Sequence, residues 1–275
     1  MSHVRALVTA SHPGPSLAIT ALVTVLAVQA SPHGLGSALV AAPAMLSGQL
    51  SVGWSNDAFD ASRDAAVGRA DKPVATGAIS ARAVWIAAGV AVLAALALSL
   101  AIGAAAGAVN GVIIAAGWAY NAGLKSTAAS GLMYLAGFGP IPAFVASTLP
   151  GHPSPTWWVT ASAAAIGLGA HFANVLPDLD GDRATGVDGL PQQVAARWGA
   201  GAVRAIALVL LLTASVLLVP GSSPPRRAVA IAGLVVSALL ALVGVRGSGR
   251  VPFLTAIGIA AVDVAVFAAG GETLT

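Results

Sequence analysis

The sequence predicts an all-α, polytopic membrane protein with about nine transmembrane helices around a central apolar cavity. Composition is the first reason, because 57% of the 275 residues are hydrophobic, only 8% are charged and the mean hydropathy is +0.87. Ordinary soluble domains carry about 25% charged residues, and a soluble protein of this length could hardly cover its surface with so few. The second reason is that long apolar runs recur along the chain, and the third is that most charged residues lie between them.

Nine apolar runs are long enough to cross about 30 Å of hydrocarbon. They lie near residues 15–30, 36–56, 81–100, 102–120, 127–148, 156–177, 201–219, 227–245 and 252–270. Backbone groups in lipid must be satisfied internally, so each run is expected to be helical. The count carries an error of about one, because the first run is short and the third and fourth nearly fuse at Gly103. The first run loosely resembles a signal peptide. We favour a first span that begins near His12-Pro13, because many spans follow.

Lysine and arginine fix the predicted orientation. With nine spans and a cytoplasmic N-terminus, every basic residue except Arg226 and Arg227 falls on the cytoplasmic side, as the positive-inside tendency requires. We therefore expect a multi-pass protein of the cell membrane whose acidic segments face the cytoplasm.

The basic pI of about 10 does not indicate nucleic-acid binding. The basic residues are scattered between apolar segments, which fits membrane topology better. Cysteine is absent, so disulfides and thiolate metal sites are excluded. The partners expected are the lipid bilayer and small molecules, and the oligomeric state is left open.

A carboxylate ladder stands at the end of the second apolar run. Asp57, Asp60 and Asp64 follow Asn56 at spacings that place them on one face of a helix. Arg63 lies within the ladder, and Arg69, Lys72-Pro73 and Gly77 follow it as basic residues and a turn. Like charges at this spacing repel unless a cation or cationic ligand lies among them.

A second acidic segment follows four predicted helices later. Asn174, Asp178 and Asp182 repeat every four residues, which predicts one helical face, and Pro177 is expected to kink or end that helix. Arg183, Gly186 and Leu190-Pro191 follow. One domain over residues 1–275 is expected. The acidic segments at 56–77 and 174–191 are compatible with a parallel four-helix internal repeat that points both toward one cavity.

The ladders indicate a metal–diphosphate site. Carboxylates at the membrane face are usually functional, hard oxygen ligands select Mg²⁺ or Ca²⁺, and Mg²⁺ is typically shared between carboxylates and substrate phosphates. The candidate metal ligands and catalytic residues are Asp57, Asp60, Asp64, Asp178 and Asp182. The candidate diphosphate ligands are Asn56, Arg63, Arg69, Lys72, Lys125, Asn174 and Arg183. The competing interpretation, ordinary ion pairs in solvated loops, needs neither the helical register nor its repetition. An interhelical hydrogen bond is an equally weighted role for Asn174.

These motifs resemble those of the UbiA superfamily of intramembrane prenyltransferases. Asn56, Asp57, Asp60 and Asp64 match its N-D-x-x-D-x-x-x-D signature, and Asp178 and Asp182 look like its D-x-x-x-D motif. The segment that runs from Tyr120-Asn121 to Lys125 is similar to its basic loop. The resemblance covers essentially the whole chain. It implies Mg²⁺-dependent transfer of a prenyl group from a prenyl diphosphate to a small acceptor, which an aromatic ring would satisfy.

Two further polar residues lie inside predicted spans. His171 continues the face of Asn174 one turn deeper, and a hydrogen-bonded structural role is favoured over a role at the acceptor. Asp263 is the only acid well inside a span, and we favour pairing with a neighbouring helix over catalysis. Asp71 and Asp188 are expected to be solvated loop charges.

Two other functions compete with prenyl transfer. A terpene cyclase of the same superfamily would use the same residues and need no acceptor. A transporter would distribute acids along its path, whereas here they cluster at one side, so transport is the less favoured hypothesis. Acceptor identity and prenyl chain length do not follow from the sequence.

Overall fold

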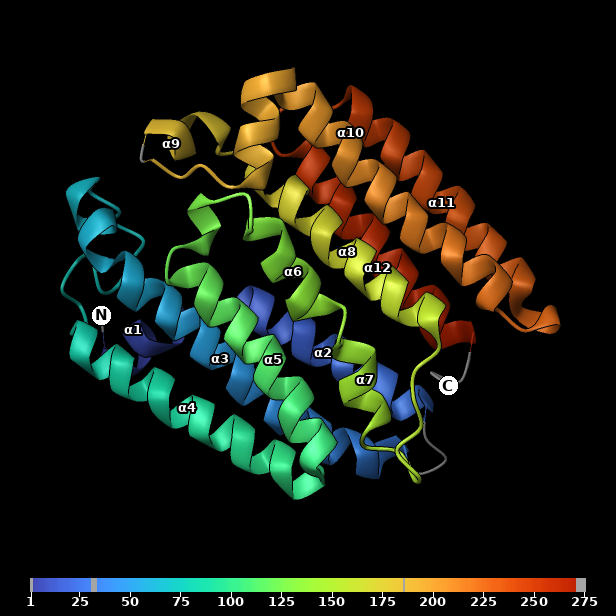
Figure 1. Cartoon of the computed structure of the whole chain (residues 1–275). Helices are drawn as coiled ribbons and strands as arrows, with labels where there is room; N and C mark the ends of the chain where they lie inside the picture. The colour runs from blue at the N-terminus through green and yellow to red at the C-terminus, as the bar shows by residue number, and fades with distance from the viewer. Residues whose placement is uncertain (1, 31–33, 185, 271–275) are drawn as a thin grey trace. The chain divides into compact units, whose positions relative to one another are not determined.

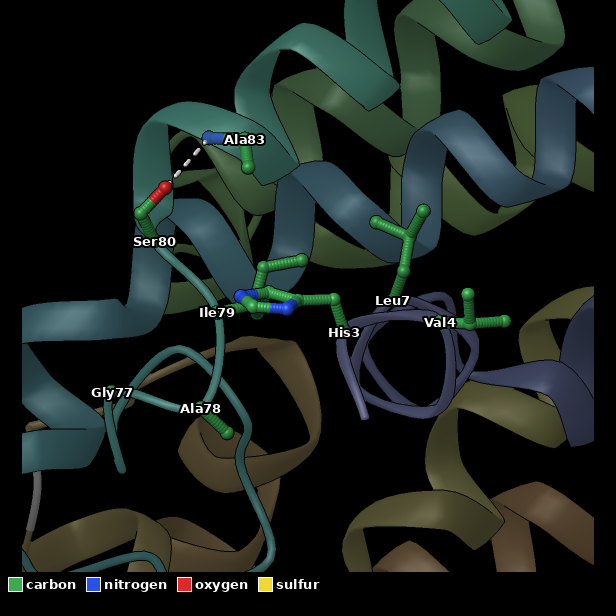
Figure 2. A pocket seen from close by; sticks show the side chains of 8 residues that line it. All are labelled: His3, Val4, Leu7, Gly77, Ala78, Ile79, Ser80 and Ala83. Atoms are coloured by element: carbon green, nitrogen blue, oxygen red, sulfur yellow. Dashed lines mark hydrogen bonds between the residues drawn. The ribbon is translucent and has the colours of Figure 1, made fainter. Parts of the chain in front are cut away.

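The computed structural model describes residues 2–30, 34–184 and 186–270 of the chain (Figure 1). All regular secondary structure in these ranges is helical, which confirms the all-α prediction. Each of the nine predicted apolar runs is helical. Residues 127–148 form two short helices, α6 (Ser130–Phe138) and α7 (Ile141–Ala146), separated at Gly139-Pro140, where proline removes a backbone donor.

Five helices of the described residues are long and apolar enough to cross a membrane: α2 (Pro13–Ala30), α3 (Gly34–Ala66), α4 (Ala81–Ile102), α10 (Leu190–Gly221) and α11 (Arg227–Arg246). Shorter apolar helical segments cover Ser130–Ala146 and Val251–Phe267. The chain is therefore a multi-pass membrane protein, and the count of nine spans is approximate.

The chain divides into two compact units. The first comprises Met1–Gly123 and Ser147–His152, and the second comprises Leu124–Ala146 and Pro153–Thr275. Each unit contains one of the two acidic segments. The four-helix repeat remains a prediction.

In the first unit, α3 packs against α2, α4 and α5 (Ala104–Asn121), and α4 runs alongside it (Figure 1). Gly103 separates α4 from α5 with an extended backbone (φ 161°), which resolves the near-fusion of these runs in the sequence. The sequence did not predict α1 (His3–Ala10), a short helix that contacts both α2 and α3. As expected, His12-Pro13 marks the start of the first long helix, α2.

Two contacts hold α1 and the turn after it against α3. The indole Nε1 of Trp54 donates to the carbonyl of Leu7 at 2.8 Å. One residue earlier, Gly53 allows a close approach to Ser11, since an added Cβ would lie 2.5 Å from the Ser11 carbonyl carbon. Together these contacts bring the α1–α2 turn next to the acidic end of α3.

In the second unit, α8 (Trp157–Val175), α10 and α12 (Val251–Gly270) share a core that includes Phe172, Leu211 and Ile259. The short helix α9 (Leu179–Ala184) follows α8. Helix α10 bends at Gly199, whose φ of 81° lies in the left-handed region that glycine adopts without steric cost. The predicted span 201–219 begins just after this bend. Asp263 accepts a 2.7 Å hydrogen bond from Ser215 of α10, which confirms its predicted pairing with a neighbouring helix.

Candidate active site

Helix α3 presents the first carboxylate ladder toward the interior of the first unit. It continues to Ala66, beyond the predicted span, so the whole ladder is helical. Asp57, Asp60 and Asp64 are 1%, 7% and 3% exposed. Their shared burial follows from the spacing of three and four residues. Buried carboxylates are costly unless they are paired or hold a metal ion, so their partners define the chemistry available here.

Side chains from two segments outside α3 contact Asp57. Lys72 Nζ donates to Asp57 Oδ1 at 2.7 Å, and His12 Nε2 lies 3.1 Å from the same oxygen. Lys72 Nζ also lies 3.0 Å from His12 Nε2. The second oxygen, Asp57 Oδ2, is buried and has no hydrogen-bond partner among the described residues. Asp57 therefore has one oxygen held by its neighbours and one oxygen available to a ligand.

Arg63 and Asn56 contact the rest of the first ladder. Arg63 Nη2 lies 2.9 Å from Asp60 Oδ2, and its Nε lies 3.9 Å from Asp64 Oδ1. Asn56 Nδ2 donates to Asp60 Oδ2 at 3.3 Å. Lys72 Nζ also donates to Asn56 Oδ1 at 3.4 Å, so each side chain of the first signature lies in one connected polar cluster at the end of α3.

Asn121, at the end of α5, makes hydrogen bonds to this cluster and to the helix that carries it. Its Nδ2 donates to the Val52 carbonyl at 2.9 Å and to Ser55 Oγ at 2.8 Å, and its Oδ1 accepts from Asn56 at 3.2 Å. An amide with two donors and an acceptor suits this bridging position. Asn121 thus fixes the register of α5 against the signature on α3.

The loop after α3 contains an exposed ion pair. Arg69 Nε and Nη2 both donate to the Asp71 carboxylate at 2.8 Å. Hydrogen bonds from Arg69 hold the pKa of Asp71 down to about 2. The Asp71 side chain is 64% exposed, which confirms that it is a solvated loop charge. Arg69 as a diphosphate ligand remains a prediction.

The second acidic segment does not lie on one continuous helix. Helix α8 ends at Val175, a turn covers residues 176–178, and α9 begins at Leu179. The predicted single helical face for Asn174, Asp178 and Asp182 is therefore wrong, whereas the prediction that Pro177 kinks or ends the helix is confirmed. The physical reason is Pro177, which cannot donate the backbone hydrogen bond that continuing the helix requires.

Within this segment, Asn174 and Asp178 are exposed and Asp182 is half-buried. Asp182 Oδ2 accepts a 2.8 Å hydrogen bond from Gln192 Nε2 at the start of α10. Gln192 is 3% exposed, and its Oε1 has no hydrogen-bond partner among the described residues. The side chain of Arg183 lies outside the described residues, so its predicted contact with diphosphate stays a prediction.

A polar network fixes the start of α10 in the second unit. Ser130 Oγ accepts from the backbone N–H of Leu190 at 2.8 Å and lies 2.9 Å from His171 Nε2. The His171 ring stacks on Tyr134 with centroids 4.2 Å apart. These contacts agree with a hydrogen-bonded structural role for His171. Lys125, in the turn before α6, is also buried.

No three His, Asp or Glu side chains in the described ranges form a group that could hold a metal ion by themselves. The residues nevertheless fit a hard cation, because Asp57 offers an unpartnered buried oxygen within a carboxylate cluster. Mg²⁺ usually takes one or two protein carboxylates and completes its shell with water and substrate phosphates. The first cluster suits such an incomplete site.

The sequence did not predict site roles for His12, Gln192 or Asn121. His12 was expected only to mark a helix start, and no spacing rule connects it with Asp57. Gln192 follows the Leu190-Pro191 pair directly, so its proximity to the second motif was a usable signal. Asn121 is adjacent to Tyr120, but its contact with Asn56 depends on how α5 packs on α3.

Comparison with known proteins gives a consistent result. A model of the UbiA prenyltransferase family matches residues 17–269. No curated protein sequence matches significantly.

Several solved structures share the fold at low sequence identity. A digeranylgeranylglyceryl phosphate synthase superposes with a TM-score of 0.74 at 13% identity, over 98% of each chain. A UbiA homologue from Archaeoglobus fulgidus bound to GPP and Mg²⁺ gives 0.71 at 14% identity, over 96% of this chain and 98% of that one. An apo UbiA homologue from Aeropyrum pernix gives 0.68 at 17% identity, over 97% and 98%.

Proposed function

The chain belongs to the UbiA prenyltransferase family, and we propose that it transfers a prenyl group from a prenyl diphosphate to a small acceptor with release of pyrophosphate. The observation that carries this proposal is the buried carboxylate cluster on α3, with an unpartnered oxygen on Asp57 beside the ammonium of Lys72. The Archaeoglobus fulgidus homologue was solved with GPP and Mg²⁺ and with DMAPP and Mg²⁺, which supports the same ligand class here.

We propose that the carboxylates of both motifs hold Mg²⁺: Asp57, Asp60, Asp64, Asp178 and Asp182. When bound, the metal would supply electrostatic stabilisation to the departing pyrophosphate. The diphosphate would be bound by Asn56, Arg63, Arg69, Lys72, Lys125, Asn174 and Arg183. Positive charge and hydrogen-bond donors at these positions favour the leaving group as its negative charge develops.

Apolar surroundings would exclude water from the allylic carbon after the C–O bond breaks. A nucleophilic carbon or hydroxyl of the acceptor then forms the new bond and loses its proton. The alternative is a terpene cyclase, in which a double bond of the same prenyl chain captures the cation. Ionisation of the prenyl diphosphate is common to both, so product analysis distinguishes them.

The test is a product survey with purified protein in liposomes. Mg²⁺, several prenyl diphosphates and pooled aromatic and hydroxyl acceptors are supplied, and pyrophosphate and prenylated products are measured. We expect acceptor-dependent pyrophosphate release that is lost in the double variant Asp57→Ala, Asp178→Ala. Full activity of that variant would refute the proposal. A hydrocarbon product formed without any acceptor would instead establish cyclisation.

We also propose that the N-terminus and both acidic segments face the cytoplasm. The chain contains no cysteine, so single cysteines can be introduced at exposed positions. Cysteines replacing Arg69 and Arg226 should be labelled by a membrane-impermeant maleimide from opposite sides of the membrane. Labelling of both from one side would contradict the nine-span orientation.

A further inference from the structure

His12 lies in the turn between α1 and α2 and contacts the candidate site from there. Its Nε2 lies 3.1 Å from Asp57 Oδ1 and 3.0 Å from Lys72 Nζ. Lys72 Nζ completes the triangle at 2.7 Å from Asp57 Oδ1. Three side chains from separate segments thus meet at a single carboxylate oxygen.

The backbone of His12 is strained. Its φ is 52°, a left-handed conformation that is uncommon for residues other than glycine. Strained backbone of this kind persists only where surrounding structure enforces it. Here the enforcing contacts are Gly53 against the backbone of Ser11 and the hydrogen bond from Trp54 to Leu7. The turn is therefore pressed onto α3 one helical turn before Asp57.

The position of the proton on the His12 ring allows two arrangements: His12 holds the carboxylate directly, or it holds Lys72, which in turn holds the carboxylate. If Nε2 carries the proton, it donates to Asp57 Oδ1. If Nε2 is bare, it accepts from Lys72, whose ammonium group has donors for both neighbours. In either case Oδ1 accepts a hydrogen bond from Lys72, and His12 bonds either to the carboxylate itself or to the ammonium group that holds it. The buried Oδ2 is left without a partner among the described residues.

We propose that His12 is a positioning residue that, together with Lys72, orients Asp57 so that Oδ2 is presented to the divalent cation. This inference rests on the proposed function, since the cation is the one that binds the prenyl diphosphate. Metal-ligating carboxylates are commonly held by hydrogen bonds of this kind, and removing such a partner typically costs about 10- to 100-fold in metal affinity or activity.

The main variant is His12→Gly. Glycine adopts the left-handed conformation without steric cost, so this change removes the imidazole without straining the turn. His152→Gly is the matched control, because His152 also has a left-handed backbone (φ 46°) but bonds to the carbonyl of Ser147. His12→Gln is the conservative variant, since its terminal amide offers a donor and an acceptor to the same neighbours.

Mn²⁺ serves as the metal probe, with inorganic pyrophosphate present, and its binding to the protein is followed by electron paramagnetic resonance. We expect His12→Gly to raise the Mn²⁺ dissociation constant by about 10- to 100-fold. The His152→Gly variant should bind like the wild type, and His12→Gln should recover part of the loss. In activity assays His12→Gly should raise the Mg²⁺ concentration for half-maximal rate more than it lowers the rate at saturating Mg²⁺.

Unchanged Mn²⁺ affinity in a folded His12→Gly variant overturns the inference, and so does an equal loss in His152→Gly. If the wild type transfers prenyl groups while His12→Gly binds Mn²⁺ normally, only the role of His12 fails. If the wild type binds no Mn²⁺ with pyrophosphate and transfers no prenyl group, the proposed function fails as well. Should His12→Gly not fold, His12→Asn decides the question by the same binding measurement, because asparagine tolerates the left-handed conformation and its shorter side chain does not reach the position of Nε2.

Discussion

Replacing Gly53 by alanine should perturb the site without touching any of its polar side chains. An added Cβ would overlap the carbonyl oxygen of Ser11 and lie 2.5 Å from its carbonyl carbon. Ordinary carbon–carbon contacts are about 3.5–4.0 Å, so the turn must move by roughly 1 Å. Because His12 is the next residue, its 3.1 Å contact with Asp57 should lengthen beyond hydrogen-bonding range.

The expected magnitude comes from comparison with a second alanine variant. Overpacking typically costs about 1–3 kcal/mol, whereas glycine to alanine in a helix gains up to about 1 kcal/mol. Gly89 in α4 has nothing within 4 Å of an added Cβ, so Gly89→Ala should gain only the stabilisation that comes from the higher helix propensity of alanine. The difference in unfolding free energy between the two variants therefore measures the steric cost, and Gly53→Ala should be less stable than Gly89→Ala by about 1–3 kcal/mol.

Thermal unfolding in detergent measures the first effect, and Mn²⁺ binding with pyrophosphate measures the second. We expect Gly53→Ala to unfold at a lower temperature than Gly89→Ala and to bind Mn²⁺ more weakly. If the two variants unfold alike and bind the metal equally well, the close approach of the α1–α2 turn to α3 does not support the site.

Three further changes test other contacts. Gln192→Leu removes the donor to Asp182 and should raise the Mg²⁺ concentration needed for half-maximal activity severalfold. Gln193 donates instead to the Asp188 carbonyl, so Gln193→Leu should leave that concentration unchanged. Equal effects of the two variants would reject a special role for Gln192. Asn121→Leu removes three hydrogen bonds between α5 and α3, to Asn56, to the Val52 carbonyl and to Ser55, and should lower the unfolding free energy by about 1–3 kcal/mol, as measured by denaturation in detergent. Asp71→Asn removes an exposed pair and should change that free energy by less than about 0.5 kcal/mol. The pKa of the Asp71 carboxyl is lowered to about 2. Its charged form therefore stabilises the folded state at a pH above its ordinary pKa of 3.8, and this small contribution is lost as the pH falls through 2. A change of more than about 0.5 kcal/mol in Asp71→Asn at neutral pH would contradict the assignment of Asp71 as a solvated loop charge.

Local periodicity was sufficient for most of the long apolar helices and for the first ladder. Residues three and four apart share a helical face whatever surrounds them, so the common burial of Asp57, Asp60 and Asp64 followed from spacing alone. The second ladder shows where periodicity fails. Pro177 ends the hydrogen-bond pattern, and the same four-residue spacing then crosses a turn between α8 and α9.

By itself the sequence determined the fold class, the apolar helices and the identity of the acidic residues, because these depend on composition and on repeats within one segment. Only the tertiary structure decided what each carboxylate contacts. His12 lies 45 residues from Asp57 along the chain, and the two meet because Gly53 lets one backbone approach another and Trp54 anchors α1. Contacts of this kind depend on the packing of whole helices, which no local pattern encodes.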